Sequence, residues 1–371
     1  MNIIHISTKS TWGGGEKQVW YLLNELHKKG ITQTLVCAKD SALADKCRTA
    51  GFSIVELPKG PLFTVTWGLG LAKITQAFAK TILHIHDGQA HNVALVHTLF
   101  SAVKNPLVVH RRIIKKNISI YQRWKFNHHA IKKIICISSA VRENLLHALY
   151  DPAKIVLIPS GIDTTQNAIN TLSKEAVKNR FGIPKDSRLI VNIGSLVPQK
   201  HQMTFLAAAK IFLNKNAEQS EAVRFAIVGE GPLRVDLEKF ISHHSLTKHC
   251  LLLGFSNAVP DILAASDILV STSVDEAFGN VIMEAFQAGT PVIATRSGGV
   301  QDLIEHKITG LLVEPLAAEA FAENCSFLLK HPETANTLRR NAFEKLSKFS
   351  IVSIADEIYK VYLSIFENSE R

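Results

Sequence analysis

The feature of this 371-residue chain that most restricts its fold is the alternation of short, strand-like apolar runs with longer amphipathic stretches. Such alternation is typical of βαβ units, which place parallel strands in one sheet and helices on its faces. The first series of expected strands covers residues 2–7, 33–38, 53–57, 81–85, 106–110, 134–138 and 154–158. The second series covers residues 188–194, 224–229, 250–254, 267–271, 291–295 and 310–313.

Two such series indicate two doubly wound α/β domains in tandem. A polar stretch rich in Asn and Thr, at residues 159–170, interrupts the pattern and is the expected linker. We therefore expect an N-terminal domain over residues 1–163 and a C-terminal domain over residues 164–350. The last segment, residues 351–371, begins with a helical stripe of apolar side chains that must be buried against another part of the chain.

The cysteines and the hydropathy of the chain indicate in which cellular compartment to expect the protein. The five cysteines lie far apart with no Cys-x-x-Cys pair, which fits a reducing compartment and excludes a zinc cluster evident from sequence. The N-terminal apolar segment has no basic region ahead of it, so we expect a first strand and not a signal peptide. No run of about 18 apolar residues is present that could span a bilayer. We expect a cytoplasmic protein, either free or attached peripherally to the cytoplasmic face of the membrane.

Charge divides unevenly between the two halves. The formal net charge is +10, of which residues 1–165 contribute +12 and residues 166–371 contribute −2. Residues 104–133 contain nine Lys or Arg and no Asp or Glu. A positive balance favours an anionic partner, such as a nucleotide, a nucleic acid, a phospholipid head group or a phosphorylated glycan. The basic segment is either a solvated face or an anion-binding surface.

Two glycine-containing loops each follow an expected strand and precede an expected helix. In the first, residues 13–16 read Gly-Gly-Gly-Glu; the amides of such a loop can approach a phosphate, and the helix N-terminus adds partial positive charge. This loop is not Gly-x-Gly-x-x-Gly and lacks the P-loop Lys-Ser/Thr, so neither a dinucleotide fold nor an NTPase is favoured, and a turn without a ligand is the alternative. The second loop, residues 194–200, ends in Lys200, which can reach a diphosphate as a point charge.

The most specific segment is residues 275–286, where Glu276 and Glu284 stand eight positions apart around a glycine. If a helix begins near Asn280, its first amides face a phosphate and Glu284, one turn further, lies on the same side. That carboxylate can bind two vicinal hydroxyls, and Glu276 is placed to bind hydroxyls of a second sugar ring. The alternative, two solvated glutamates, fits Glu284 poorly because its neighbours are apolar and an unpaired buried carboxylate is costly.

At these residues the chain resembles the retaining glycosyltransferases of family 4, which include bacterial lipopolysaccharide, capsule and glycolipid sugar transferases. The resemblance covers nearly the whole chain and implies the GT-B fold. In that fold two Rossmann-like doubly wound domains face each other across a deep cleft, and the C-terminal helix crosses back to the N-terminal domain. The motifs that carry the resemblance are residues 13–16, 137–140, 158–163, 194–200, 228–232, 253–255, 275–286, 288–294 and 298–299.

The resemblance also implies roles for individual residues. Gly13 and Gly14 would lie near the donor diphosphate, and Lys200 would pair with it. Glu284 would hold the ribose of the nucleotide, and Glu276 would contact the transferred sugar. The other donor contacts that the resemblance implies are Gly254, Phe278, Gly279, Asn280 and Val281.

His86 joins Glu276 and Lys200 as the third implied catalytic residue, because it stands at the family's His-x-His strand end and would bind hydroxyls beside the sugar. Taken alone, the pair His84 and His86 is more simply explained as structural than as metal-binding. The chain departs from the family pattern at Ser195, where an arginine is common, and at residues 301–302, where Pro-Glu is common. No Asp-x-Asp motif occurs, so we expect no metal and no cofactor; Lys200 and the helix dipole would take the place of a metal.

We therefore expect an enzyme, a retaining hexosyltransferase that moves a sugar from a UDP- or GDP-sugar to a glycan or glycolipid in cell-envelope polysaccharide or lipopolysaccharide synthesis. A nucleotide-sugar epimerase of the same architecture is the alternative, and it would act without an acceptor. A basic nucleic-acid-binding protein would explain the charge but not the two glutamates, so we expect no nucleic acid. The acceptor or an anionic inner-membrane surface is expected to meet Arg111, Arg112, Lys115, Lys116 and Lys125.

Overall fold

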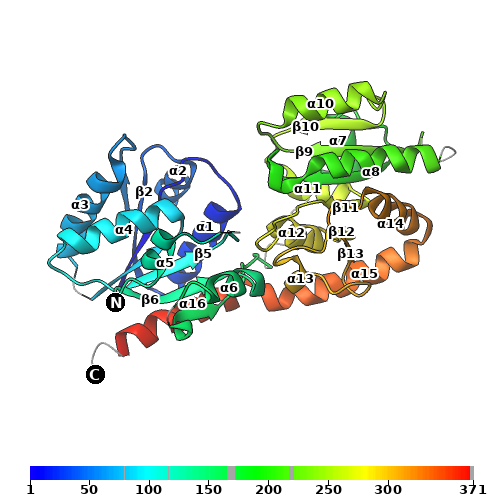
Figure 1. Cartoon of the computed structure of the whole chain (residues 1–371). Coiled ribbons are helices and arrows are strands. Elements are labelled where there is room, and N and C mark those ends of the chain that lie inside the picture. Colours follow the sequence, from blue (N-terminus) through cyan, green and yellow to red (C-terminus); the bar gives the residue numbers. More distant parts are fainter. Residues whose placement is uncertain (79, 116, 150, 165–171, 217–220, 368–371) are drawn as a thin grey trace. The chain divides into compact units, whose positions relative to one another are not determined.

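The computed structural model describes the chain except for residues 79, 116, 150, 165–171, 217–220 and 368–371. The chain divides into two compact units, Met1–Asp163 with Phe349–Arg371 as unit 1 and Thr164–Lys348 as unit 2. In each unit a parallel β-sheet has helices on its faces (Figure 1). No helix in the described part of the chain is long and apolar enough to cross a membrane.

The sheet of unit 1 has seven parallel strands in the order β3-β2-β1-β4-β5-β6-β7. Strand order reverses between β1 and β4, as in other doubly wound sheets. The strands are β1 (Asn2–Ser7), β2 (Thr32–Ala38), β3 (Ile54–Leu57), β4 (Thr81–Ile85), β5 (Leu107–Arg111), β6 (Ile131–Cys136) and β7 (Ile155–Leu157). The helices are α1 (Gly14–Lys28), α2 (Ala42–Thr49), α3 (Phe63–Gln76), α4 (Gly88–Phe100), α5 (Ile120–Phe126), α6 (Ser139–Leu146) and α16 (Ile351–Glu367).

The sheet of unit 2 has six parallel strands in the order β10-β9-β8-β11-β12-β13, and its order reverses between β8 and β11. The strands are β8 (Arg188–Ile193), β9 (Val223–Val228), β10 (Cys250–Gly254), β11 (Ile268–Ser271), β12 (Val292–Thr295) and β13 (Leu311–Val313). The helices are α7 (Lys174–Arg180), α8 (Gln202–Lys215), α10 (Arg234–His243), α11 (Val259–Ala265), α12 (Asn280–Ala288), α13 (Val300–Leu303), α14 (Ala318–Lys330) and α15 (Pro332–Lys345).

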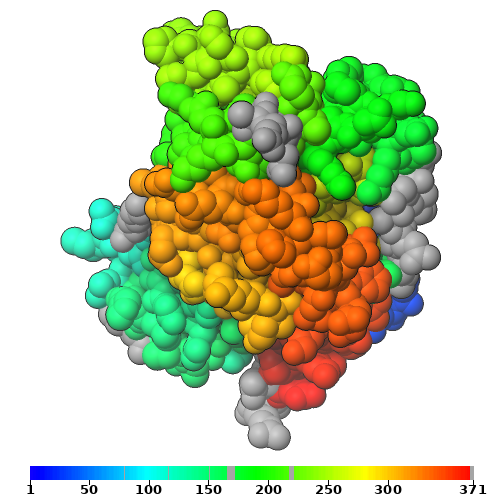
Figure 2. Space-filling model, turned by 90° about the vertical axis from the view of Figure 1, so that its right-hand side faces the viewer, coloured from blue at the N-terminus to red at the C-terminus, as the bar shows by residue number. Residues whose placement is uncertain are grey.

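Every strand expected from the apolar runs is present, with ends that differ by a few residues. Strands β1, β4 and β5 are buried along their whole length, which explains why they consist of continuous apolar runs and not of alternating patterns. In unit 2, Phe205 and Phe212 of α8 pack with Phe225 of β9 and Phe321 of α14 in the core under the sheet. Figure 2 shows α14 and α15, in orange, at the surface of unit 2.

The C-terminal helix α16 belongs to unit 1. Its stripe residues Ile354, Ile358 and Tyr362 are buried in one cluster with Ile3 of β1 and Leu22 of α1. In Figure 1 this helix, in red, lies against the strands and α1 of unit 1. The expectation that the terminal helix returns to the N-terminal half of the chain is therefore confirmed.

The chain re-enters unit 1 through close backbone contacts. The Ile162 amide donates to the Phe349 carbonyl at 2.8 Å, and the Ile351 amide donates to the Ile162 carbonyl at 2.9 Å. The side-chain amide of Gln18 bonds both backbone groups of Gly161, at 2.7 and 2.8 Å. A Cβ at Gly161 would lie 2.7 Å from Ile351 Cδ1 and 2.9 Å from its Cα, so this crossing requires glycine.

Candidate functional site

In open parallel sheets, ligands bind beyond the carboxyl ends of the strands, at the point where strand order reverses. Unit 1 has this switch point between β1 and β4, and unit 2 has it between β8 and β11. The loops and strand ends at these two points contain Gly13, His86, Lys200 and Glu276.

In unit 2, Lys200 ends a short 3₁₀ turn (Pro198–Lys200) that follows β8. Its backbone is held by the loop after β11: the Thr272 hydroxyl donates to the Lys200 carbonyl at 2.9 Å, and the Val274 amide donates to the Gln199 carbonyl at 2.9 Å. The lysine stem runs past Gly194, where an added Cβ would be 3.5 Å from Lys200 Cδ. The two loops of the switch point therefore fix the lysine together.

The lysine head group meets the first glutamate of the two-glutamate segment. Lys200 Nζ donates to Glu276 Oε2 at 2.5 Å, and both side chains are largely but not fully buried. The Glu276 carbonyl accepts a bond from the Gly299 amide at 2.9 Å. The residues expected to bind diphosphate and sugar thus lie together, 76 positions apart in sequence, and contact each other.

Helix α12 begins at Asn280, as the segment predicts. Gly279 precedes it with φ of 107°, a left-handed conformation that favours glycine, and a Cβ there would lie 2.9 Å from Ile282 Cδ1. Glu284 lies one turn into the helix and is half-buried, while Phe278 is fully buried. Val281 is in the first turn, where backbone amides have no partner within the helix.

Three other residues of unit 2 are placed as follows. Gly254 ends β10 with φ of 73°, and its carbonyl accepts from the Gly229 amide at 2.8 Å. Ser195, where an arginine is common in the family, is exposed. Arg296 pairs with Glu314 at 2.9 Å in the structure.

In unit 1, the glycine loop leads directly into α1. Gly13 is extended and caps the helix, and Gly14 is its first residue. Glu16, in the first turn, is half-buried, and burial raises the pKa of its carboxyl above the ordinary value. A Cβ at Gly13 would lie 3.1 Å from Glu16 Oε2. The loop is therefore narrow at the point where a ligand would meet the first amides of α1.

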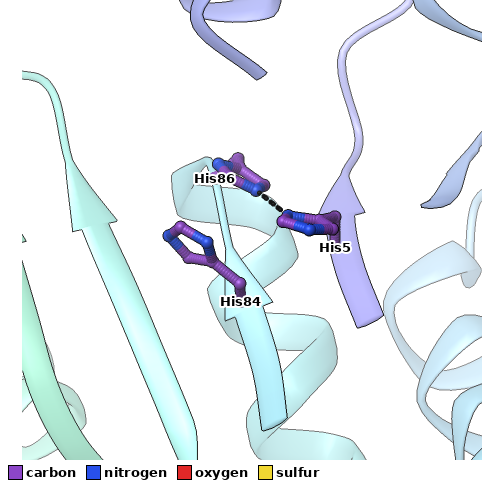
Figure 3. A group of neighbouring side chains, drawn as sticks. All are labelled: His5, His84 and His86. Atoms are coloured by element: carbon purple, nitrogen blue, oxygen red, sulfur yellow. Dashed lines mark hydrogen bonds between the residues drawn. The ribbon is translucent and has the colours of Figure 1, made fainter. Parts of the chain in front are cut away.

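Three buried histidines lie at the switch point of unit 1. His5 comes from β1, and His84 and His86 come from β4 and its carboxyl end (Figure 3). One ring nitrogen from each histidine lies within 4.8 Å of the corresponding nitrogens of the other two. Tyr362 of α16 bonds His84 Nδ1 at 2.5 Å, and the His110 ring of β5 stacks on His84 with centroids 5.4 Å apart.

Hydrogen bonds indicate which nitrogen of His86 carries the proton. Arg112 Nη1, which can only donate, bonds the His86 carbonyl at 3.1 Å and lies 3.4 Å from His86 Nδ1. His86 Nδ1 therefore accepts, and Nε2 donates to His5 Nδ1 at 2.9 Å (Figure 3). Burial lowers the pKa of His5 to about 3 and holds that of His86 well below the ordinary value, so both rings are neutral.

The same three rings are the group that could hold a metal ion. Three neutral imidazoles are suitable ligands for zinc. However, the guanidinium of Arg112, which is charged at neutral pH, contacts His86, and its charge opposes a second cation in the same place. We therefore interpret the rings as a buried hydrogen-bonded network that holds Arg112.

The expected basic surface of unit 1 requires correction. Arg111 and Lys125 are buried, so they cannot meet an acceptor or lipid head groups from the surface. Lys125 Nζ instead donates to the Gly88 carbonyl at 2.9 Å and to Asn92 Oδ1 at 2.5 Å, both on α4. Burial lowers the pKa of Lys125 to about 8, and these acceptors explain why its ammonium group is tolerated there.

The other three cations of that surface differ among themselves. Arg112 is half-buried, and burial lowers the pKa of its guanidinium to about 10. Lys115 is exposed, and Lys116 lies outside the described residues. A count of positive charges therefore did not identify which of them face solvent.

Sequence reasoning missed three residues of the unit 1 site: His5, Tyr362 and Asp87. Asp87 caps α4 by accepting from the amides of Gln89 and Ala90, and it also accepts from the Thr8 amide at 2.7 Å. An Asp directly after a strand and before a helix is a recognisable N-cap signal. His5 and Tyr362 carry no such local signal, because only the fold brings β1 and α16 beside β4.

Comparison with protein-family models gives two matches that together span most of the chain. The model described as Glycosyltransferase Family 4 matches residues 12–166, and the model described as Glycosyl transferases group 1 matches residues 173–345. Among curated proteins, the chain is 28% identical over 313 residues to the UDP-Gal:alpha-D-GlcNAc-diphosphoundecaprenol alpha-1,3-galactosyltransferase of Escherichia coli. That alignment covers 81% of this chain and 79% of the relative.

Solved structures resemble the whole chain in fold. A glycosyltransferase from Rickettsia africae superposes with a TM-score of 0.86 at 20% identity and covers 99% of both chains. Anabaena HepE, solved with UDP and glucose, superposes with a TM-score of 0.84 at 19% identity, covering 98% of this chain and 99% of the other.

Proposed function

The chain belongs to the family 4 glycosyltransferases and has the GT-B fold, and from this premise we propose that it transfers a sugar from a nucleotide-diphosphate donor to a glycan or glycolipid acceptor. The observation that carries this proposal is the contact of Lys200 with Glu276 at the switch point of unit 2, beside the start of α12. This arrangement offers a cation and helix amides for a diphosphate and carboxylates for sugar hydroxyls.

We assign the donor to unit 2. Lys200 and the first amides of α12 hold the diphosphate, Glu284 binds the ribose, and Glu276 binds the transferred sugar. Gly254 and residues 278–281 complete the donor contacts. The Anabaena structures contain UDP with glucose and UDP-glucose, which favours a UDP-sugar donor for this chain.

We assign the acceptor to unit 1, where His86 and Arg112 stand at the carboxyl ends of the strands. Since both ring nitrogens of His86 have partners, this residue acts through Arg112 by holding the guanidinium in place. The named acceptor of the E. coli relative is a diphosphoundecaprenol-linked GlcNAc, which favours a lipid-linked glycan and a role in cell-envelope synthesis.

The proposed reaction retains the configuration of the sugar. The bond between the anomeric carbon and the diphosphate oxygen breaks, and the acceptor oxygen bonds that carbon on the same face. The acceptor proton goes to the departing phosphate oxygen, so no dedicated protein base is needed. The role of the enzyme is to orient both substrates and to stabilise the charge that develops on the diphosphate, with Lys200 and the helix dipole in place of a metal.

A donor screen followed by transfer assays tests this function. UDP-sugars and GDP-sugars are compared by thermal shift, since a ligand that binds the folded state raises its melting temperature. The best donor is then incubated with GlcNAc-diphosphoundecaprenol, with and without EDTA, and the product linkage is assigned by NMR. We expect acceptor-dependent transfer, an α-linkage from an α-linked donor, and no loss of activity in EDTA.

Three results would contradict parts of the proposal. Conversion of the donor sugar to its epimer without any acceptor would favour the epimerase alternative. A β-linked product from an α-linked donor would overturn retention. Activity that disappears in EDTA and returns with Mg²⁺ or Mn²⁺ would overturn the metal-free mechanism.

A further inference from the structure

Helix α5 of unit 1 turns its large apolar side chains toward solvent. Ile120 is 89% exposed, Trp124 is 55% exposed and Tyr121 is 54% exposed; Ile113, in the loop before the helix, is 54% exposed. Positions 120 and 121 lie four and three residues before position 124, so all three share one side of the helix. We call these four residues the α5 apolar face. A soluble domain normally buries such a face.

The orientation of α5 is fixed by the contacts on its other side. Lys125 donates to Gly88 and Asn92 of α4, and Phe126 is buried under the guanidinium of Arg111, 5.4 Å from the ring centre. Figure 1 shows α5 beside α4 accordingly. The charged end of Lys125 thus points inward, as Phe126 does, while Ile120, Tyr121 and Trp124 point outward.

Local structure adds to this restraint. Ser119 and Gln122 form a reciprocal capping box at the start of the helix. The Tyr121 hydroxyl donates to Asn92 Oδ1 at 3.2 Å, and the rings of Tyr121 and Trp124 stack with centroids 5.9 Å apart. The apolar face is therefore presented by a capped helix that is tied to α4.

The segment of the chain that carries this face is positively charged. Lys115, Arg123 and Lys132 are exposed, and residues 104–133 contain no Asp or Glu. A groove of about 470 Å³ beside the face combines apolar and basic side chains; its lining residues are Ile120, Arg123, Trp124, Asn127, His128 and His129. An occupant of this surface must therefore be apolar at its centre and anionic at its edge.

We propose that the α5 apolar face docks unit 1 on an anionic lipid bilayer. Trp and Tyr side chains favour the boundary between head groups and acyl chains, where Ile120 and Ile113 can enter the apolar layer. Lys115, Arg123 and Lys132 then meet anionic head groups. This surface goes beyond the proposed reaction, and it replaces the buried Arg111 and Lys125 as the means of attachment.

Cosedimentation with vesicles tests the proposal. The wild-type protein is mixed with vesicles of phosphatidylglycerol and phosphatidylcholine in equal parts, and with vesicles of phosphatidylcholine alone. The test variant is Ile120→Ser with Trp124→Ser. The matched control is Val235→Ser with Phe343→Ser, because these two side chains are also exposed and apolar but lie in unit 2. A charge variant, Lys115→Gln with Arg123→Gln, probes the edge of the surface.

We expect the wild type to bind the anionic vesicles and to dissociate as salt is added, since the Debye length falls with ionic strength. The Ile120/Trp124 variant should lose at least tenfold in vesicle affinity, and the charge variant should lose several-fold. The Val235/Phe343 control should bind as the wild type does. The melting-temperature shift with UDP should be the same in all four proteins, so loss of vesicle binding is separable from failure of the donor site.

Several outcomes would overturn the proposal. One is a wild-type protein that stays in the supernatant with anionic vesicles at low salt. Another is equal loss in the Val235/Phe343 control, which would make the effect one of general hydrophobicity. A third is a wild-type dimer in sedimentation velocity that becomes monomeric in the Ile120/Trp124 variant, since the face would then be an interface between copies of this chain.

Discussion

The switch points of the two sheets occupy the same topological place but differ in the side chains that they hold and in the burial of those side chains. Between β1 and β4 of unit 1, the residues are histidines inside or at the ends of buried strands. Between β8 and β11 of unit 2, they are Lys200 and Glu276, on loops that remain partly open to solvent. Burial keeps the histidine rings of unit 1 neutral, whereas Lys200 and Glu276 of unit 2 form an ion pair.

This difference fits the division of labour proposed above, with the donor at unit 2 and the acceptor at unit 1. A diphosphate leaving group needs positive charge near it, and a partly exposed lysine supplies that charge at moderate desolvation cost. An acceptor hydroxyl needs oriented hydrogen-bonding groups, which a buried network of neutral rings holds rigidly. Acid and the replacement of single residues should therefore affect the two units differently.

Mild acid should destabilise unit 1 far more than unit 2. Burial lowers the pKa of His5 to about 3 and holds those of His84, His86 and His110 well below the ordinary value. The unfolded chain binds these protons near pH 6.5 and the folded chain does not, so the stability they contribute is complete above pH 6.5 and is lost as pH falls. The loss grows with the number of rings that stay neutral in the folded state, and all four of these rings lie in unit 1.

Hydrogen exchange at peptide resolution, corrected for intrinsic rates, measures this effect in both units at once. Between about pH 7.5 and about pH 5.5, amides of β1 and β4 should lose protection while those of β8 and β11 keep it. Unit 2 is the internal control. Equal loss in both units would show that the histidine network does not set the acid stability of unit 1.

Replacing Lys200 should give the largest effect on catalysis. Lys200→Ala removes the cation placed for the departing diphosphate, so turnover should fall roughly 10²-fold, as for other groups that stabilise developing charge. Lys239→Ala is the control, because Lys239 is an exposed lysine of α10 in the same unit. A steady-state assay in which both variants keep wild-type turnover would remove Lys200 from the catalytic set.

Much of unit 2 could be predicted because its signals are local in sequence. The start of α12 at Asn280 follows from the glycine before it, and Glu284 is then placed by helical geometry alone. The strands of both sheets follow from apolar runs, since a strand buried on two faces leaves little choice of residue. The position of Lys200 next to Glu276 required only that β8 and β11 be neighbours.

Unit 1 was less predictable because its site depends on contacts between distant segments. Nothing near His5 indicates that it meets His86, and Tyr362 reaches His84 only because α16 returns to the sheet. The charge run 104–133 could not show which side of α5 faces α4. Lys125 is buried because α4 supplies oxygen acceptors for it, and this information is absent from the run itself.

Replacing Glu284 should weaken donor binding moderately. Glu284→Ala removes the carboxylate assigned to the ribose, which UDP and a UDP-sugar share, so both ligands should lose about 2 kcal/mol of binding free energy, the scale of a charged hydrogen-bond pair. Isothermal titration calorimetry with each ligand measures the loss. Weakening of the UDP-sugar alone would move Glu284 from the ribose to the transferred sugar.

Replacing Glu276 should give the smallest effect on UDP, and of the opposite sign. In the free protein this carboxylate holds Lys200 Nζ, so UDP must compete with it for the lysine, whereas a UDP-sugar can engage Glu276 through its own hydroxyls. Glu276→Gln removes the competing charge, and because partly exposed ion pairs contribute up to about 1 kcal/mol, UDP should bind up to about fivefold tighter. The UDP-sugar loses its carboxylate contact, so the preference for the sugar-loaded donor over UDP should narrow.

Glu319→Gln, which breaks the exposed pair with Lys215 in the same unit, is the matched control and should change neither affinity. If calorimetry instead finds UDP weakened in Glu276→Gln as much as in Glu284→Ala, then Glu276 supports the diphosphate site and does not compete with it, and the proposed separation between a lysine for the phosphates and a glutamate for the sugar fails.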